Sequence, residues 1–291
     1  SIFLQKMFTT TRTIAAMFVA GPYVTMASRR LSTNIAARSV ISIPEDFYFR
    51  QLTAGRDFAL SSAPVHDFAR QMNNFVYVIG DKSEGIAMVI DGAWDPEAIA
   101  NIVEADNLNL TTHIATHYHW DHIGGAVNGI RIPGIYDWAE RGLPVYIPSQ
   151  ELKLAAEQTD TDESLLTPLD DGQCMSIGKY GVEFIHTPGH SPGSMCLRVT
   201  TGAEGDNTQN ISDILLITGD TVFPGSCGRL DLPGSDPKIM YDSLQKLTHL
   251  DNNLPIYPGH GYGGSSSTIG KEKKSGLLRD ITRTQWNQMM A

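Results

Sequence analysis

The 291-residue sequence has few cysteines and no long hydrophobic run. Its three cysteines, Cys174, Cys196 and Cys227, are odd in number and show no Cys-x-x-Cys spacing, which argues against a disulfide framework and a cysteine-based zinc site. No apolar run reaches the roughly 18 residues that a membrane span needs. We therefore expect no membrane partner, and the ordinary content of 41% hydrophobic and 19% charged residues indicates a globular protein.

Residues 1–44 contain no aspartate or glutamate and are rich in Arg, Ser, Thr and Ala. This composition is typical of a mitochondrial transit peptide, so we expect a location in the mitochondrial matrix. A secretory signal, a disordered N-terminal arm and a cytoplasmic location are the alternatives. The fold is expected in residues 45–291.

Basic residues are scarce in that body. Five of the 22 lysines and arginines precede the first acidic residue, Glu45, which leaves 17 basic and 32 acidic residues in the remainder. A chain this acidic repels a phosphate backbone. Nucleic acid is therefore excluded as the expected substrate.

Strand and helix patterns alternate through the body. Residues 75–79 and 85–90 are β-branched or apolar and flank Gly80-Asp81, which predicts a hairpin. Asp95-Pro96 and Asp236-Pro237 each predict a helix start, with Asp as the N-cap. Further strands are expected at 112–115, 145–147, 182–186, 195–200 and 214–218, helices at 150–158 and 237–247, and a surface loop at 202–212. This mixture favours an α/β sandwich.

Histidines and aspartates gather directly after the predicted strands. They stand in the segments THYHWDH (116–122), HTPGH (186–190), TGDT (218–221) and PGHG (258–261). Imidazole and carboxylate together suit Zn or Fe, and a carboxylate can bridge two ions. We assign one ion to His117, His119 and His190, a second to Asp121, His122 and His260, and the bridging position to Asp220.

These segments, in this order, resemble the metallo-β-lactamase superfamily over about residues 70–265. The resemblance implies a four-layer αββα sandwich in a single domain. Within the superfamily, the segment GSCGR (225–229) is similar to the GCGR loop of the branch that contains glyoxalase II and the persulfide dioxygenases. The sequence LDLPG (230–234) departs from glyoxalase II, which has an aromatic pair there. Only 31 residues follow His260, and they contain Lys271, Lys273, Lys274 and Arg279. A solvated charged tail is their simplest interpretation.

The resemblance implies a binuclear metallo-hydrolase with two Zn²⁺, or mixed Zn and Fe, per chain. The expected reaction is hydrolysis of a small thioester, such as a hydroxyacyl-glutathione, by a hydroxide that the metals hold. Asp121 and Asp220 would orient that hydroxide, and Arg229, Lys271 or Lys273 would bind a substrate carboxylate. The expected partner is a thiol-derived small molecule, glutathione conjugates included, and the chain is expected as a monomer or homodimer.

The main alternative is a mitochondrial glutathione persulfide dioxygenase. The resemblance would then assign a single Fe(II) to His117, His190 and Asp220. Leu232 argues against this alternative, because those enzymes have phenylalanine at the matching position. A metal-binding protein without catalytic activity is the third hypothesis, and the complete set of seven ligands argues against it.

Overall fold

The computed structural model describes residues 41, 43–60, 63–202 and 211–290. The predicted transit peptide lies almost entirely outside the described residues, as does most of the predicted loop at 202–212. Among the described helices, none has the length and apolar character needed to cross a membrane.

The N-terminal half, residues 43–169, builds the first sheet. Its strands lie in the order β1-β2-β3-β4-β7-β8, antiparallel up to β3 and parallel beyond it. The strands are β1 (Phe47–Thr53), β2 (Phe75–Asp81), β3 (Ile86–Ile90), β4 (Asn109–Ile114), β7 (Val145–Pro148) and β8 (Leu166–Leu169). A separate small hairpin consists of β5 (Gly125–Val127) and β6 (Ile130–Ile132). The helices are α1 (Ala63–Met72), α2 (Pro96–Ala105), α3 (Trp120–Ile123), α4 (Ile135–Glu140) and α5 (Leu152–Thr159), with 3₁₀ turns at Ser149–Glu151 and Glu163–Leu165.

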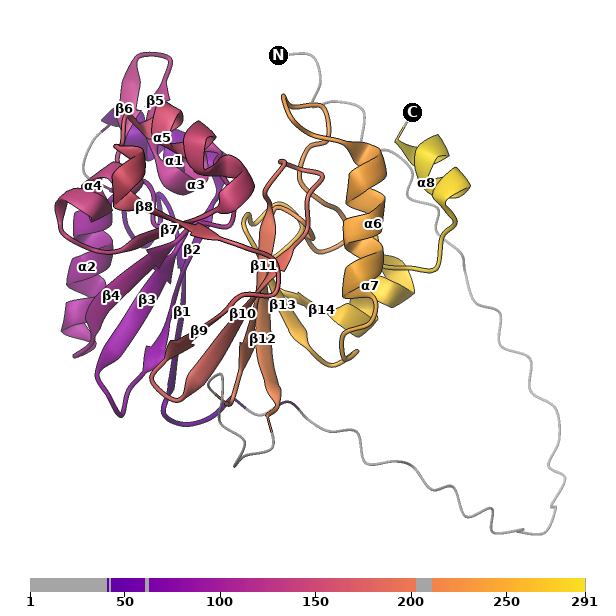
Figure 1. Cartoon of the computed structure of the whole chain (residues 1–291), viewed down its shortest axis with the longest axis horizontal. Helices are drawn as coiled ribbons and strands as arrows, with labels where there is room; N and C mark the ends of the chain where they lie inside the picture. The colour runs from indigo at the N-terminus through magenta and orange to yellow at the C-terminus, as the bar shows by residue number, and fades with distance from the viewer. Residues whose placement is uncertain (1–40, 42, 61–62, 203–210, 291) are drawn as a thin grey trace, which may run out of the picture. The chain divides into compact units, whose positions relative to one another are not determined.

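The C-terminal half, residues 174–290, builds the second sheet in the order β14-β13-β12-β11-β10-β9. Its strands are β9 (Cys174–Ile177), β10 (Tyr180–His186), β11 (Met195–Thr200), β12 (Asp213–Gly219), β13 (Pro255–Pro258) and β14 (Ser267–Thr268). Its helices are α6 (Pro237–Leu247), α7 (Ile269–Ser275) and α8 (Arg283–Met289). The helices of each half flank the outer side of that half's sheet (Figure 1).

Side-chain alternation explains this layering. Along β2, Phe75, Tyr77 and Ile79 belong to the apolar cluster between the two sheets, whereas Val76 and Val78 pack in the cluster with the N-terminal helices. Successive residues of a strand point to opposite faces, so a strand between two layers must be apolar on both. The chain is therefore a four-layer αββα sandwich, as the sequence predicts.

The predicted helix starts are confirmed. Asp95 accepts a hydrogen bond from Ala98 N and caps α2, and Asp236 accepts hydrogen bonds from Lys238 N and Ile239 N and caps α6. A proline follows each cap, at a position where the helix needs no N–H donor.

The interpretation of the last 31 residues as a solvated charged tail was wrong. They form α7 and α8, and Ile269, Leu277, Leu278 and Trp286 are buried in the apolar cluster beneath the second sheet. The lysines of α7 lie on its exposed or half-buried side and hid this apolar face from sequence inspection.

Candidate metal centre and substrate pocket

The seven predicted ligands follow the carboxyl ends of strands from both halves. His117 and His119 come after β4, and the short helix α3 carries Asp121 and His122. His190, Asp220 and His260 come after β10, β12 and β13. The fold brings all seven together in three overlapping groups, whose ligand atoms lie within 4.8 Å of one another. The groups are His117/His119/His190, His117/His122/Asp220 and Asp121/His122/His260.

Asp220 lies among the histidines of both predicted ion sites. Its Oδ2 is 3.4 Å from His190 Nε2 and 3.3 Å from His260 Nε2, and its Oδ1 is 3.5 Å from His122 Nε2. Asp121 Oδ2 lies 3.3 Å from His260 Nε2. Asp220 thus lies between histidines that the sequence assigns to different ions.

In four of the histidines, Nδ1, the ring nitrogen that points away from the centre, contacts another polar group. Nδ1 of His190 lies 2.8 Å from Arg229 O, and Nδ1 of His260 lies 2.7 Å from Met72 O. Nδ1 of His122 lies 3.0 Å from Asp91 Oδ2. His117 Nδ1 lies 3.0 Å from the Thr116 hydroxyl. A carbonyl or carboxylate at Nδ1 fixes the tautomer that directs the Nε2 lone pair inward, as in metal-ligating histidines.

The donor set fits a cation. His117 Nε2 and Asp220 Oδ1 are buried and have no hydrogen-bond partner among the described residues, a costly arrangement for polar atoms unless an ion binds them. Burial and the neighbouring histidines hold the pKa of His117 well below its ordinary value. Burial also lowers the pKa of His119, to about 4. Both imidazoles are therefore neutral at pH 7, which is the form that binds metal.

The carboxylates of the site are ionised. Burial alone would raise the pKa of Asp121, but His122 and His260 lower it well below the ordinary value. Asp220 behaves in the same way, because His260, His122 and His190 outweigh the effect of burial on its pKa. The same carboxylates outweigh burial and raise the pKa of His122 to about 9 and that of His260 well above its ordinary value. Without a metal, the centre thus combines anionic oxygens with two neutral imidazoles, those of His117 and His119, and two protonated ones. A bound cation would displace the protons of His122 and His260.

Two glycines allow this close assembly. A Cβ at Gly259 would lie 2.3 Å from Asp220 Oδ1. Gly219 has a φ of 46°, and a Cβ there would lie 2.7 Å from the Thr116 hydroxyl. Any larger residue at either position would displace a ligand or the loop beside it.

Two polar residues that sequence inspection missed hold the ligand loops. The Asn74 amide donates to Asp121 Oδ2 at 3.0 Å. Glu151 is fully buried; it accepts a hydrogen bond from Tyr118 N on Oε2 and another from Gly193 N on Oε1, each at 2.7 Å. Tyr118 lies between two ligands of the N-terminal half, and Gly193 lies in the loop of His190. A single carboxylate therefore joins the two halves at the centre, although a lone glutamate at a strand end carries no distinctive sequence signal.

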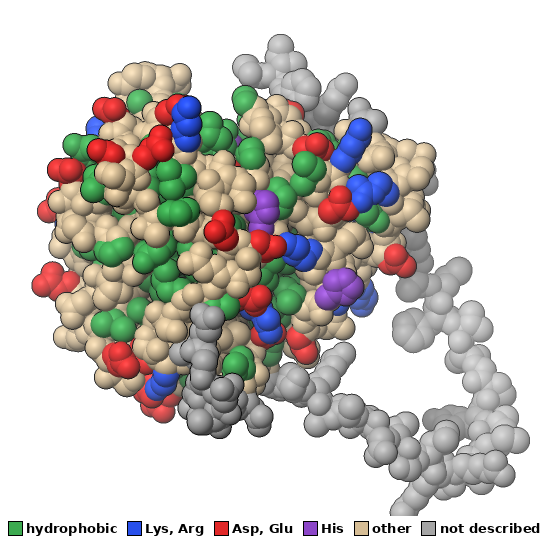
Figure 2. All heavy atoms as spheres, viewed as in Figure 1, with side chains coloured by type: hydrophobic (Ala, Val, Ile, Leu, Met, Phe, Trp, Pro, Cys, Tyr) green, Lys and Arg blue, Asp and Glu red, His purple; other side chains and the backbone are tan. Residues whose placement is uncertain are grey.

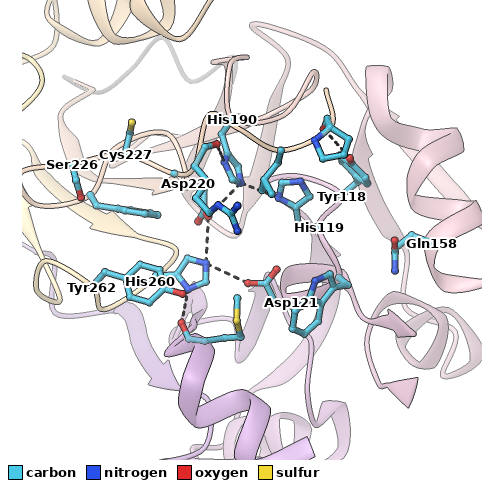
Figure 3. Close-up of a pocket in the computed structure, with 17 residues that line it drawn as sticks. Tyr118, His119, Asp121, Gln158, His190, Asp220, Ser226, Cys227, His260 and Tyr262 are labelled. Carbon is cyan, nitrogen blue, oxygen red and sulfur yellow. Dashed lines mark hydrogen bonds and ion pairs between the residues drawn. The ribbon is translucent and has the colours of Figure 1, made fainter. Parts of the chain in front are cut away.

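A cavity of about 600 Å³ opens above the centre. His119, Asp121, His190, Asp220 and His260 line it and point toward a common space (Figure 3). Aromatic and apolar side chains form much of the remaining wall: Met72, Tyr118, Trp120, Phe223, Leu232, Pro233 and Tyr262. The cavity is thus a place where a small organic molecule can meet the metal ligands.

Comparisons with known proteins agree with this geometry. Residues 69–202 match the family model described as the metallo-beta-lactamase superfamily. The chain belongs to this superfamily.

Two of the relatives are named as hydrolases, and one similar solved structure contains iron. The probable polyketide biosynthesis zinc-dependent hydrolase BaeB of Bacillus velezensis is 27% identical over 68% of this chain and 78% of that protein. The hydroxyacylglutathione hydrolase GloC of Haemophilus influenzae is 28% identical over 65% of this chain and 85% of that protein. The crystal structure of TTHA1623 in a di-iron-bound form superposes with a TM-score of 0.54 at 26% identity, covering 70% of this chain and 94% of that one.

As a member of the metallo-β-lactamase superfamily, the chain is a metal-dependent hydrolase. Its relatives include hydroxyacylglutathione hydrolases, which is consistent with the glyoxalase II and persulfide dioxygenase branch that the sequence resembles.

The three residues that we expected to bind a substrate carboxylate do not all lie at the cavity. Arg229 lines the cavity, whereas Lys271 and Lys273 of α7 do not. Lys273 Nζ instead donates to Asn252 Oδ1 at 2.7 Å, so the positions of these lysines do not support substrate binding.

Lysine and arginine side chains are dispersed over the face shown in Figure 2. Proteins that bind a phosphate backbone usually carry a broad patch of basic side chains. The basic side chains on this face do not form such a patch.

Proposed function

We propose that this chain is a binuclear thioesterase that hydrolyses a small acylated thiol, with hydroxyacyl-glutathiones as the first substrates to test. The observation that carries the proposal is the convergence of seven histidine and aspartate side chains at the floor of one cavity. The names of two relatives, a probable zinc-dependent hydrolase and a hydroxyacylglutathione hydrolase, support it.

The seven residues would hold two Zn²⁺, or mixed Zn and Fe, in the arrangement that the sequence predicts. When bound, such ions acidify water and polarise a carbonyl oxygen at neutral pH. The remaining steps belong to the chain's own residues. Asp121, which the Asn74 amide keeps in place, orients the attacking water by accepting its hydrogen bond. A thiolate is a good leaving group, so no strong general acid is required beside the sulfur.

The walls of the cavity complete the proposed reaction. Tyr118, from the N-terminal half, donates from its hydroxyl to Pro233 O of the C-terminal half at 3.5 Å. Both residues line the cavity, so its wall is shared by the two halves of the described chain. Gln158 lines the cavity on the side opposite Tyr262 and offers a neutral hydrogen-bonding group (Figure 3).

Metal content per chain tests the proposal first. Protein purified without added metal would be measured by elemental analysis and then assayed with S-lactoylglutathione and simple acyl thioesters. We expect about two ions per chain, largely zinc, and thioester cleavage that a chelator abolishes. Two bound ions without cleavage of any thioester would refute the thioesterase.

The second candidate is the persulfide dioxygenase with one Fe(II) on His117, His190 and Asp220. The complete second set of ligands makes it the weaker proposal, because Asp121, His122 and His260 would then hold no ion. One iron per chain, with O₂ uptake on addition of glutathione persulfide, would favour it over the thioesterase.

We also propose that residues 1–44 direct the chain to mitochondria. Their lack of acidic residues supports this. Fusing residues 1–44 to a fluorescent protein tests the proposal, and a diffuse cytoplasmic signal would contradict it.

A further inference from the structure

The cavity walls carry information about the substrate that the metal ligands do not. Apart from the ligands, the wall residues come from the end of α1, the region around the start of α3, Gln158 of α5, the segment between β12 and α6, and Tyr262 after β13. Two of these residues, Phe223 and Tyr262, are aromatic neighbours of the ligand His260. The Tyr262 ring stacks on His260 with a centroid distance of 4.6 Å, and Phe223 packs edge-on against both at 5.8 and 6.0 Å.

The side of the cavity opposite Tyr262 is also largely apolar, with Gln158 as its uncharged polar residue (Figure 3). Tyr118 and Trp120 flank the ligand His119 in the sequence, and both line the cavity. Trp120 is supported from behind by Trp94, which is buried and packs edge-on against it at 5.6 Å. Met72 and Leu232 add aliphatic surface. A thioester bound at the metal ligands would therefore lie between two apolar walls.

Charge on these walls is almost absent. Of the described residues, Arg229 is the single lysine or arginine that lines the cavity. Its guanidinium already forms a two-pronged ion pair with Asp231, with Nε–Oδ1 and Nη2–Oδ2 distances of 2.9 Å. Glutathione carries two carboxylates and one ammonium group, and free side chains of opposite charge are the groups that would favour it most strongly over a neutral thiol. The Arg229–Asp231 pair is neutral as a unit and does not supply them.

We infer that the cavity selects thioesters with an uncharged, apolar acyl group of several carbons, and that it gives glutathione no preference over a neutral thiol. This inference rests on the proposed thioesterase function and specifies its substrate class. Apolar surface that enters such walls contributes to transition-state binding in proportion to its buried area. Walls without free cationic side chains give the carboxylates of glutathione no partner to offset the water that they would lose.

Chain-length dependence of hydrolysis tests the acyl group. The metal-loaded full chain would be assayed with acetyl, butyryl and hexanoyl thioesters of N-acetylcysteamine, a neutral thiol, and with S-lactoylglutathione. Each buried methylene is expected to raise kcat/KM by up to roughly fourfold. Hexanoyl should exceed acetyl by at least about tenfold and should also exceed S-lactoylglutathione. A flat chain-length series, with S-lactoylglutathione as the best substrate, would overturn the inference.

Direct binding separates this inference from the proposed function. Calorimetry with thioethers, which the protein cannot hydrolyse, would compare S-methyl- and S-hexyl-N-acetylcysteamine with S-hexylglutathione. We expect the hexyl compounds to bind more tightly than the methyl compound, with no advantage for glutathione. If no thioester is cleaved, the thioesterase fails while these affinities still decide the nature of the cavity. Equal affinity for methyl and hexyl, or tighter binding of the glutathione compound, would refute the apolar selection.

A variant that adds a positive charge to the cavity wall, compared with a matched control, tests whether this wall determines the substrate preference. Leu232→Arg places a free cation on the wall and should lower the ratio of hexanoyl to lactoylglutathione activity by about tenfold. Leu165→Arg makes the same change at a residue that is 47% exposed and outside the cavity, and should leave the ratio unchanged. Equal ratios in the two variants would show that this wall does not select the substrate.

Discussion

The two halves of the described chain supply the metal centre in different ways. The N-terminal half provides four of the seven candidate ligands within the single stretch 117–122. The C-terminal half provides His190, Asp220 and His260 from three loops that are 30 and 40 residues apart. One local turn and the short helix α3 set the first contribution. The second exists only after β10, β12 and β13 have assembled into a sheet.

This difference separates local from global determinants of one site. A change inside 117–122 removes a ligand from an arrangement that the backbone of one loop maintains. A change at Asp220 removes a group that lies within 3.5 Å of three histidines, one from the N-terminal half and two from the C-terminal half. The C-terminal ligands should therefore be more sensitive to the integrity of the fold, whereas ligands of both kinds should be essential to the chemistry.

Removing one ligand from each half gives the largest expected effect. His117→Ala and Asp220→Ala should each lower hydrolysis by on the order of 1,000-fold or more and reduce the bound metal per chain, because water activation requires the complete centre. Activity assays and elemental analysis on the same samples measure both quantities. Full activity in either variant would remove that residue from the centre.

The second-largest expected effect is a loss of stability when the buried tryptophan of α8 is removed. Trp286 of α8 is fully buried, and its Nε1 donates to Pro237 O at the start of α6 at 2.6 Å. Trp286→Ala should cost about 3–5 kcal/mol of unfolding free energy, because it leaves a large cavity. Met289→Ala, on the same helix at a residue 45% exposed, is the control and should cost less than about 0.5 kcal/mol.

Chemical denaturation measures both of these variants. Similar losses of stability in the two would mean that α8 does not belong to the core, as the charged-tail interpretation required. The comparison therefore tests whether the last 31 residues complete the second sheet's outer layer.

The sequence predicts features whose interacting residues are close together in the chain. It misses features that depend on contacts between distant segments. The stretch 117–122 and the caps at Asp95 and Asp236 are readable because all their partners lie within a few residues. The apolar side of α7, α8 and the segment between them is hard to recognise in the sequence, because Ile269, Leu277 and Trp286 are widely spaced among lysines, serines and glutamines. Glu151 was invisible for another reason, since its role depends on two backbone N–H groups that only the folded chain brings to it. Strands as short as β9 and β14 contain too few residues to show the alternation of apolar and polar residues that indicates a strand.

Glu151 also offers the most direct test of how the halves are joined. Glu151→Gln keeps the shape of the side chain but replaces one accepting oxygen with an amide that faces an N–H donor. Metal affinity or activity should fall about 10–100-fold, as for other groups that support metal ligands. Glu157→Gln on the next helix, at an exposed site, is the matched control.

Spectra of the cobalt-substituted protein distinguish two roles of Glu151, positioning the metal ligands and stabilising the fold. Changed Co²⁺ absorption in Glu151→Gln would show that the ligands have moved within the folded protein. Lower thermal stability with an unchanged spectrum and unchanged metal affinity would mean that Glu151 stabilises the fold without setting the ligand geometry.

The pH dependence of stability provides the smallest and last test. Burial raises the pKa of Glu151 to about 7 in the folded protein, whereas its ordinary value is 4.5. The folded state therefore binds an extra proton between these values, so this group's stabilising contribution is complete below pH 4.5 and is lost as pH rises through 7. Between pH 5.5 and 8, the wild type should lose about 2 kcal/mol more unfolding free energy than Glu151→Gln, which cannot titrate. Urea denaturation of both proteins across this range measures the difference, in which the titrations of the shared histidines cancel. Parallel stability profiles would show that the carboxylate joining the two halves is already ionised throughout, with its two N–H donors outweighing its burial.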